Sequence, residues 1–475
     1  MKKMFSKRKM YNVIALMLSL AMICGFFTGC GTPVNQKSSD GKVHITIGGM
    51  PNEKTEANAA TYELFQENVK KFMQENPNIV VEADPWSFDL KNYLTKAAAG
   101  DLPTMFYTSP TELRTLVNSG YIKDVTKFAK KYGYEDGYNN EDYSDLYKVD
   151  DKYYALVKDG SISYIGIIYN INLFRQAGLL DENGIPKYPQ TWEELAQTAK
   201  IIKDKTGKYG FCMPTKNNQG GWLFLNIMWA YGADFMEKKD GKWVATFASD
   251  EGAAALNYLK DLKWKYNVLQ DETLADVFTE GQYLSTDNVG MTINGVGMLN
   301  NFVSKFQLDV KNMAMSRNPA GPAGRISQRN SNIYVFSGTD EENEACFKWL
   351  DCIGQGAKAN DAMKENIEKN AKISAGKNYA VGYGVLSVWK DKERNKVESE
   401  ILDKYATVDK KYFKDYIDGE DVIYKSEPPR CAQQLYSVLD ACIQQVLNDK
   451  NADCKAILEQ AQKDFQLNYL DKETN

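Results

Sequence analysis

The chain has 475 residues, of which 58 are basic, 63 are acidic and one is a histidine. Without the five cations among its first ten residues, 53 basic residues stand against 63 acidic ones, a net charge of about −10 that disfavours nucleic acid and anionic membrane surfaces as partners. The single histidine, His44, excludes a histidine-based triad, a histidine acid–base pair and a multi-histidine metal site. We therefore expect no metal and no cofactor.

The first thirty residues have the pattern of an export signal. Five basic residues precede an apolar run at 13–27, which is shorter than the ~20 residues of a spanning helix and ends at Thr28-Gly29-Cys30. A cysteine after small residues at this place resembles the bacterial lipoprotein signal, which implies that Cys30 is lipidated and becomes the mature N-terminus. An uncleaved membrane anchor is the alternative.

We accordingly expect residues 1–29 to be a signal peptide and residues 30–42 to be a polar, turn-rich linker behind a lipid anchor. Two acyl chains hold a protein stably at a membrane, so the rest of the chain is expected on the extracytoplasmic face. The sequence leaves open whether this face is a Gram-positive surface or a periplasmic leaflet.

Six cysteines remain after Cys24 in the leader and Cys30 at the lipid site. Three of them, Cys346, Cys442 and Cys454, share helical faces with aliphatic residues, which is typical of core positions. We expect buried free thiols, although an extracytoplasmic setting permits disulfides and the sequence cannot assign pairs.

From residue 43 onward, strand and helix patterns alternate. Val43, Ile45 and Ile47 alternate with polar residues as in a half-buried strand, and apolar residues follow at helical spacing through 62–72. The next predicted elements are a strand at 79–81, a helix at 93–99 and a strand at 105–107. This alternation predicts a mainly parallel α/β sheet.

The pattern changes over residues 152–170, which read as two extended, aromatic-rich segments with no helix between them, as expected for a crossing between lobes. Thr191 and Glu194 form a capping box before a helix, and residues 318–324 are an irregular, Pro/Gly-rich crossing. A strand at 333–336, a helix at 341–353 and a mostly helical C-terminal region follow.

Several segments, in order across nearly the whole mature chain, resemble the extracellular solute-binding proteins of ABC importers, in particular their carbohydrate-binding, maltose/maltodextrin-type branch. The segments are KFMQENPNIVVE, AAAGDLPTMFYTSPTELRTLVNSGYIKDV, DDKYYALVKDGSISYIGIIYNINLFRQAGL, PQTWEELAQTAKIIK, GGWLFLNIMWAYGADFM, VGMTINGVGMLNNF and NPAGPAGRIS. The resemblance implies a periplasmic-binding-protein-like α/β fold, with two lobes joined by hinge strands and a ligand cleft that closes on binding. We expect one lobe at 43–155 plus 316–357 and the other at 156–315 plus 358–475.

A sugar site needs aromatic platforms and paired polar side chains, because sugars present apolar C–H faces and hydroxyl edges. Trp222 follows Gly220-Gly221, where the family often places a stacking aromatic, and Arg325 could donate a forked pair of hydrogen bonds. The ligand-binding residues that the resemblance implies are Asn52, Glu53, Tyr107, Ser109, Ser163, Tyr164, Trp222, Asn294, Arg325, Gln433 and Tyr436.

We interpret the chain as a non-enzymatic, monomeric receptor that captures a carbohydrate, an oligosaccharide above all, and delivers it to the permease subunits of an ABC importer. One alternative is a receptor for an anionic solute, such as a polyol phosphate or a sugar acid, with Arg325 as the counter-charge. Another is a surface glycoside hydrolase with two catalytic carboxylates, although no motif marks such a pair. The identity, length and linkage of the sugar stay open.

Overall fold

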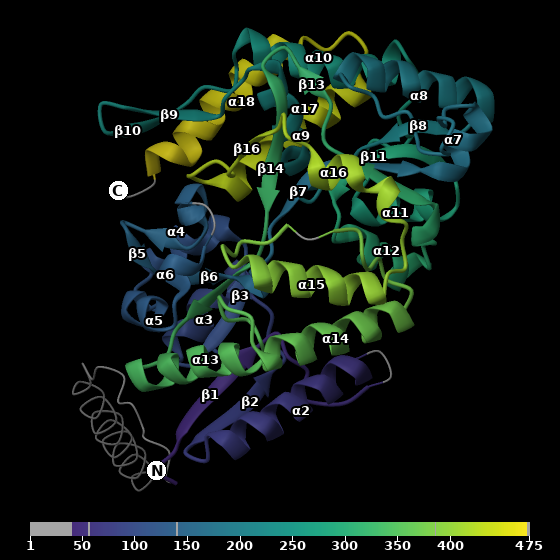
Figure 1. Ribbon diagram of the computed structural model, residues 1–475. Coiled ribbons are helices and arrows are strands. Elements are labelled where there is room, and N and C mark those ends of the chain that lie inside the picture. The colour runs from purple at the N-terminus through teal and green to yellow at the C-terminus, as the bar shows by residue number, and fades with distance from the viewer. Residues whose placement is uncertain (1–39, 56–57, 139–140, 385, 473–475) are drawn as a thin grey trace, which may run out of the picture.

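The computed structural model describes residues 40–55, 58–138, 141–384 and 386–472. Besides two small two-stranded sheets, β4 (Lys148–Val149) with β5 (Lys152–Tyr153) and β9 (Met236–Lys239) with β10 (Lys242–Ala245), it contains two large sheets, each flanked by helices (Figure 1). The predicted signal peptide, most of the linker and Cys30 lie outside these residues. The two sheets lie in two lobes, one built mainly from the N-terminal third of the chain and the other from its middle and C-terminal parts. The predicted two-lobed α/β architecture is confirmed.

The first sheet has the order β2-β1-β3-β15-β6. Its strands are β1 (Val43–Gly48), β2 (Ile79–Asp84), β3 (Met105–Thr108), β6 (Ala155–Val157) and β15 (Ile333–Phe336). The first three strands are parallel, as the alternation predicted, whereas β15 runs antiparallel to both β3 and β6. The helices beside this sheet include α2 (Ala59–Glu75), α3 (Leu90–Ala98) and α13 (Asp340–Cys352).

The second sheet is organised around β7, which is buried along nearly its whole length and pairs with β11, β12 and β14. Its strands are β7 (Ser163–Asn170), β8 (Tyr209–Cys212), β11 (Val289–Gly295), β12 (Met313–Ser316), β13 (Ala320–Gly321), β14 (Gly324–Asn330) and β16 (Ile423–Lys425). The helices of this lobe include α8 (Trp192–Thr206), α9 (Gln219–Tyr231), α10 (Asp250–Trp264), α12 (Met298–Phe306), α17 (Ala432–Asn448) and α18 (Cys454–Asn468).

The chain crosses from the first sheet to the second between β6 and β7, through a short 3-10 turn at Lys158–Gly160. The two extended segments predicted over 152–170 are confirmed by these strands. The chain returns between β14 and β15, so residues 331–332 join the two sheets.

The Pro/Gly-rich segment 318–324 was expected to be a crossing, but it forms the turn of a hairpin in which β13 pairs with β14. The hairpin packs directly on α9. A Cβ on Gly321 would lie only 2.3 Å from the carbonyl oxygen of Ala230, so this position has no room for a side chain. Residues 320–330 thus belong to the second sheet, whereas the predicted first lobe began its second segment at residue 316.

Beyond residue 357, α14 (Asp361–Gly376) lies against α2 of the first lobe. Lys369 forms an ion pair with Glu67 at 2.7 Å, and Lys71 forms one with Glu365 at 2.9 Å. We therefore propose that the first lobe also contains α14, in place of the predicted division at residue 357.

Cys346, Cys442 and Cys454 are buried free thiols as predicted, and Cys212 is a fourth. Burial raises the pKa of the Cys212 and Cys346 thiols, which keeps them protonated and unreactive. In the part of the chain that the structure describes, no helix is long and apolar enough to cross a membrane.

Candidate functional site

Gly220 and Gly221 allow the start of α9 to lie directly against α17. A Cβ on Gly221 would lie 2.1 Å from the carbonyl oxygen of Tyr436, and one on Gly220 would lie 2.7 Å from that of Pro214. Any larger residue would push the two helices apart. The glycine pair therefore brings Trp222, in the first turn of α9, close to the first turn of α17.

Asp440 of α17 fixes this arrangement with its carboxylate. The carboxylate accepts hydrogen bonds from the backbone nitrogens of Asn218, at 2.6 Å, and Gly221, at 2.7 Å. An anion at a helix N-terminus is favourable, because unpaired N–H groups and the helix dipole meet there. Asn218 has a φ of 68°, a left-handed conformation that asparagine tolerates better than most residues.

A chain of side-chain hydrogen bonds then crosses from the second lobe to the first. Asn218 donates to the Gln433 side-chain oxygen at 3.3 Å, and the Gln433 nitrogen donates to Thr111 Oγ1 at 3.4 Å. Thr111 Oγ1 lies 2.9 Å from the hydroxyl of Ser109, in the loop that follows β3. These hydroxyl and amide groups are half-buried, so they line the junction of the lobes and can exchange partners with a polar ligand.

Trp222 and Tyr436 lie beside this chain and share the carboxyl group of Glu427. The Tyr436 hydroxyl donates to Glu427, and burial raises the pKa of that carboxyl to about 7. The amide of the fully buried Gln328 lies against Trp222; in the orientation that satisfies both groups, it donates to the Trp222 carbonyl at 3.0 Å and accepts from the indole N–H. We call Ser109, Thr111, Asn218, Trp222, Glu427, Gln433 and Tyr436 the interlobe cluster.

A cavity of about 580 Å³ lies at the hinge and is called the hinge cavity here. Met50 and Tyr334 of the first lobe, Ser163 at the start of β7 and Val296 just after β11 are among its lining residues. Its volume falls within the ~300–1,000 Å³ that is typical of small-molecule sites. The ammonium group of Lys158, another lining residue, lies 5.4 Å from the ring centre of Tyr107, which is one of the predicted ligand-binding residues.

The predicted contacts thus fall into separate groups. Ser109, Trp222, Gln433 and Tyr436 lie in the interlobe cluster, and Ser163 and Tyr107 lie at or next to the hinge cavity. Asn52 and Glu53 are exposed in the loop after β1.

The three remaining predicted contacts, Tyr164, Asn294 and Arg325, are buried within the protein. The Tyr164 ring stacks on Tyr424, with ring centres 3.7 Å apart, and its hydroxyl lies 3.2 Å from that of Tyr143. Asn294 is 1% exposed and donates to the carboxylate of Glu280 at 2.9 Å. A ligand contact at Asn294 would require this internal bond to break.

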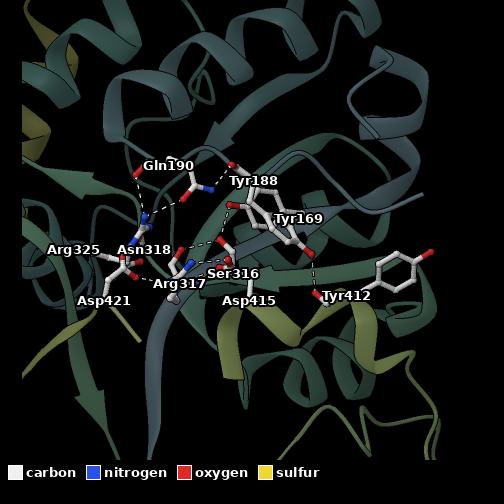
Figure 2. Close-up of polar contacts among 10 residues, drawn as sticks. All are labelled: Tyr169, Tyr188, Gln190, Ser316, Arg317, Asn318, Arg325, Tyr412, Asp415 and Asp421. Atoms are coloured by element: carbon white, nitrogen blue, oxygen red, sulfur yellow. Dashed lines mark hydrogen bonds and ion pairs between the residues drawn. The ribbon is translucent and has the colours of Figure 1, made fainter. Parts of the chain in front are cut away.

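Arg325 is also engaged inside the second lobe, as Figure 2 shows. Its guanidinium donates to the Asn318 carbonyl, to the Gln190 side-chain oxygen at 3.1 Å and to the Asp421 carboxylate at 3.3 Å. Arg325 is 7% exposed, so its fork of donors stabilises the β13–β14 hairpin rather than facing the junction of the lobes.

Sequence reasoning missed Thr111, Asn218 and Glu427 as members of the interlobe cluster. The sequence contains only weak indications of their role. Asn218 lies just before the glycine pair, and Glu427 opens the Glu-Pro-Pro segment before α17. Among the described residues, no group of three or more His, Cys, Asp or Glu side chains could hold a metal ion.

Comparison with known proteins supplies the family. The sequence profile of the bacterial extracellular solute-binding proteins matches residues 56–354, which is more than half of the chain. The chain belongs to this family. It is therefore an extracytoplasmic solute-binding protein of the kind that serves ABC transporters, and not an enzyme.

Individual relatives are distant in sequence. A putative binding protein of Brucella abortus (strain 2308) is 25% identical over 348 residues, covering 70% of this chain and 76% of the relative. The cyclic alpha-maltosyl-1,6-maltose binding protein of Arthrobacter globiformis aligns with a TM-score of 0.61 and 19% identity over 89% of this chain and 98% of that one. UgpB of Mycobacterium tuberculosis, in complex with glycerophosphocholine, aligns with a TM-score of 0.63 and 15% identity over 90% and 98%. These likenesses show that the solute-binding protein has the two-lobed fold of such receptors.

Proposed function

We propose that this solute-binding protein is a lipid-anchored, monomeric receptor that captures a neutral carbohydrate, an oligosaccharide in particular, and delivers it to the permease of an ABC importer. The observation that carries the proposal is the interlobe cluster. It combines an indole, a tyrosine and a carboxyl group with amide and hydroxyl side chains from both lobes. Such a set matches the apolar faces and hydroxyl edges of sugars.

Closure of the lobes around the ligand follows from the same cluster. Gln433 of α17 bonds to Thr111 of the first lobe, so a ligand between them would bind side chains of both lobes at once. Only a ligand that interacts with both lobes favours the closed over the open form, and the closed form is what a permease can select.

Neutral ligands are favoured over anions by the position of the arginine. Arg325, the counter-charge of the anionic alternative, donates its hydrogen bonds to Asn318, Gln190 and Asp421. Glu427 and the buried Glu112 add acidic groups to the junction. Because UgpB is a structural neighbour and was solved with glycerophosphocholine, phosphate-bearing solutes belong in the test.

The test is a thermal-shift screen of the full chain, purified in detergent, against monosaccharides, neutral oligosaccharides, sugar acids and polyol phosphates. A ligand present at a hundred times its Kd stabilises the folded state by about 2.7 kcal/mol, a shift that the screen detects. We expect one neutral series to raise Tm without product formation. A shift with anionic solutes alone would contradict the proposal, as would failure of the ligand to reduce the radius of gyration in small-angle scattering.

A further inference from the structure

None of the residues of the interlobe cluster lines the hinge cavity, and one wall of the cavity comes from two helices of the C-terminal half of the chain. This wall is formed by α14 and by α15 (Lys392–Lys404), which lie next to each other and face the hinge segment (Figure 1). Two ionisable residues of α15, Arg394 and Glu398, line the cavity. They are four residues apart and therefore lie on the same face of the helix.

The guanidinium of Arg394 is buried, but not all of its hydrogen-bond donors have a partner in the described part of the chain. Its side chain is 3% exposed and lies against the Trp389 ring, with the guanidinium carbon 5.2 Å from the ring centre. Nη1 donates to the carbonyl of Gly354 at 3.3 Å, while Nε has no hydrogen-bond partner among the described residues. A buried charged donor without a partner is costly, so the guanidinium has hydrogen-bonding capacity that the protein does not use, and the side chain borders the cavity.

Glu398 supplies the complementary group. Burial raises the pKa of its carboxyl, and the nearby charge of Arg394 opposes that rise. The i,i+4 spacing places the two side chains on one face of α15, where the charge of Arg394 acts on Glu398 and both groups line the cavity. The cavity therefore holds a donor and an acceptor side by side, the pattern that two adjacent sugar hydroxyls would satisfy.

The balance of charge favours a neutral ligand. The ionisable residues in the lining are Lys158, Asp159, Arg394 and Glu398, two cations and two anions, and Lys158 pairs with Asp159. Asn370, Ser161 and Ser374 add neutral polar groups, and the ring of Tyr383 adds an apolar surface. The lining has no excess of cations to balance an anion, whereas a polyhydroxy ligand can both donate to the carboxylates and accept from the cations.

We propose that the hinge cavity is a sugar subsite, in which Arg394 donates to and Glu398 accepts from hydroxyl groups on one neutral sugar unit of the bound glycan. This inference rests on the proposed function and adds to it, because it assigns ligand contacts to α15, a helix on which sequence reasoning placed none. It also requires the ligand to extend from the interlobe cluster towards the hinge.

The experiment compares substitutions on two faces of α15 in the full chain. Arg394→Met and Glu398→Gln remove the inward pair, while Lys396→Met and Glu400→Gln alter a matched i,i+4 pair that is 74% and 65% exposed on the outward face. The probes are gluco-, manno-, xylo- and galacto-oligosaccharides from disaccharide to hexasaccharide, with affinity measured by titration calorimetry.

We expect each inward substitution to weaken binding of the best neutral glycan by about 10- to 100-fold, because each removes a hydrogen bond to a charged group. The outward substitutions should leave Kd unchanged. If Glu398→Gln does not fold, Arg394→Lys, which keeps the charge but loses the planar fork, supplies the same comparison. Hydrogen exchange should also show protection of the α15 amides when the glycan is added to the wild-type chain.

Three outcomes would overturn the inference, and they are distinguishable. If the wild-type chain binds a neutral glycan but the inward variants bind it equally well, only the subsite is wrong. If the wild-type chain binds none of these glycans, the proposed function fails and the subsite fails with it. Weakening in the inward and outward variants alike would also contradict a direct contact.

Discussion

The side-chain nitrogen of Gln433 lies 3.4 Å from the hydroxyl oxygen of Thr111, and this contact joins α17 of the second lobe to the loop after β3 of the first. The sequence separates the two residues by more than three hundred positions. Because they belong to different lobes, the contact breaks when the lobes move apart. Substitution of Gln433 therefore tests the contact between the two lobes directly.

Gln433→Ala should weaken ligand binding by about tenfold. The substitution removes one polar contact for the ligand, worth about 1 kcal/mol, and the bonds to Asn218 and Thr111 that orient the Gln433 side chain. Titration calorimetry measures the effect. Ser437→Ala, at an exposed position of the same helix, is the control, and equal affinities of the two variants would remove Gln433 from the site.

Trp222→Ala should weaken binding more strongly than Trp222→Phe, because phenylalanine keeps an aromatic face for stacking while alanine does not. We expect a loss of roughly tenfold or more for alanine. Ligand-induced changes in tryptophan fluorescence provide a second readout, since they should be much smaller in Trp222→Phe. Trp264→Phe, at a surface tryptophan that is 44% exposed, should keep both the affinity and the fluorescence change.

Glu280 should make the free energy of unfolding fall as pH rises from about 5 to 8. Burial raises the pKa of this fully buried carboxyl from 4.5 to about 8, so the folded state retains a proton that the unfolded state has already released. The loss is on the order of 4 kcal/mol at pH 8, because one pKa unit corresponds to ~1.4 kcal/mol.

Urea unfolding of Glu280→Gln at several pH values checks this prediction. The neutral side chain can still accept from Asn294, so the variant should show a flatter pH profile over the same range. The exposed Glu272→Gln should keep the wild-type slope. A wild-type slope in Glu280→Gln would assign the pH dependence to other groups.

Cys30→Ser should abolish lipid labelling and release the protein from the membrane fraction. The prediction rests on the sequence alone, since Cys30 lies outside the described residues. Incorporation of labelled palmitate during expression measures it, with Cys24→Ser in the leader as the control. Retained label in Cys30→Ser would contradict the proposed anchor.

Much of the local structure could be predicted because it depends on neighbours in the sequence. Thr191 caps α8 by accepting from the Glu194 nitrogen at 3.2 Å, and the predicted stripe that includes Trp192 and Ile202 is buried. The strand at 333–336 also has the predicted bounds. The capping box was only half right, because the Glu194 carboxylate accepts from Gln190 instead of Thr191.

The site was harder to predict because hydrogen-bond partners are set by tertiary packing. Trp222 and Gln433 were predicted, and the glycine pair before Trp222 gave a physical signal for their meeting. Arg325 looked equally suitable in the sequence, yet its partners Asn318 and Asp421 leave it inside the second lobe. Arg394 and Glu398 have the spacing of an ordinary surface ion pair, so nothing local distinguished them from Lys396 and Glu400.

The position of β15 has a consequence for how the protein is made. This strand lies between β3 and β6, yet it follows both in the chain by more than 170 residues. The first sheet cannot be completed until Phe336 has been synthesised, since β15 is the strand that joins β6 to β3. Late pairing of this kind slows folding and leaves the nascent N-terminal part without a finished core. An extracytoplasmic protein gains from such a delay, because a chain that has not yet folded can still be exported.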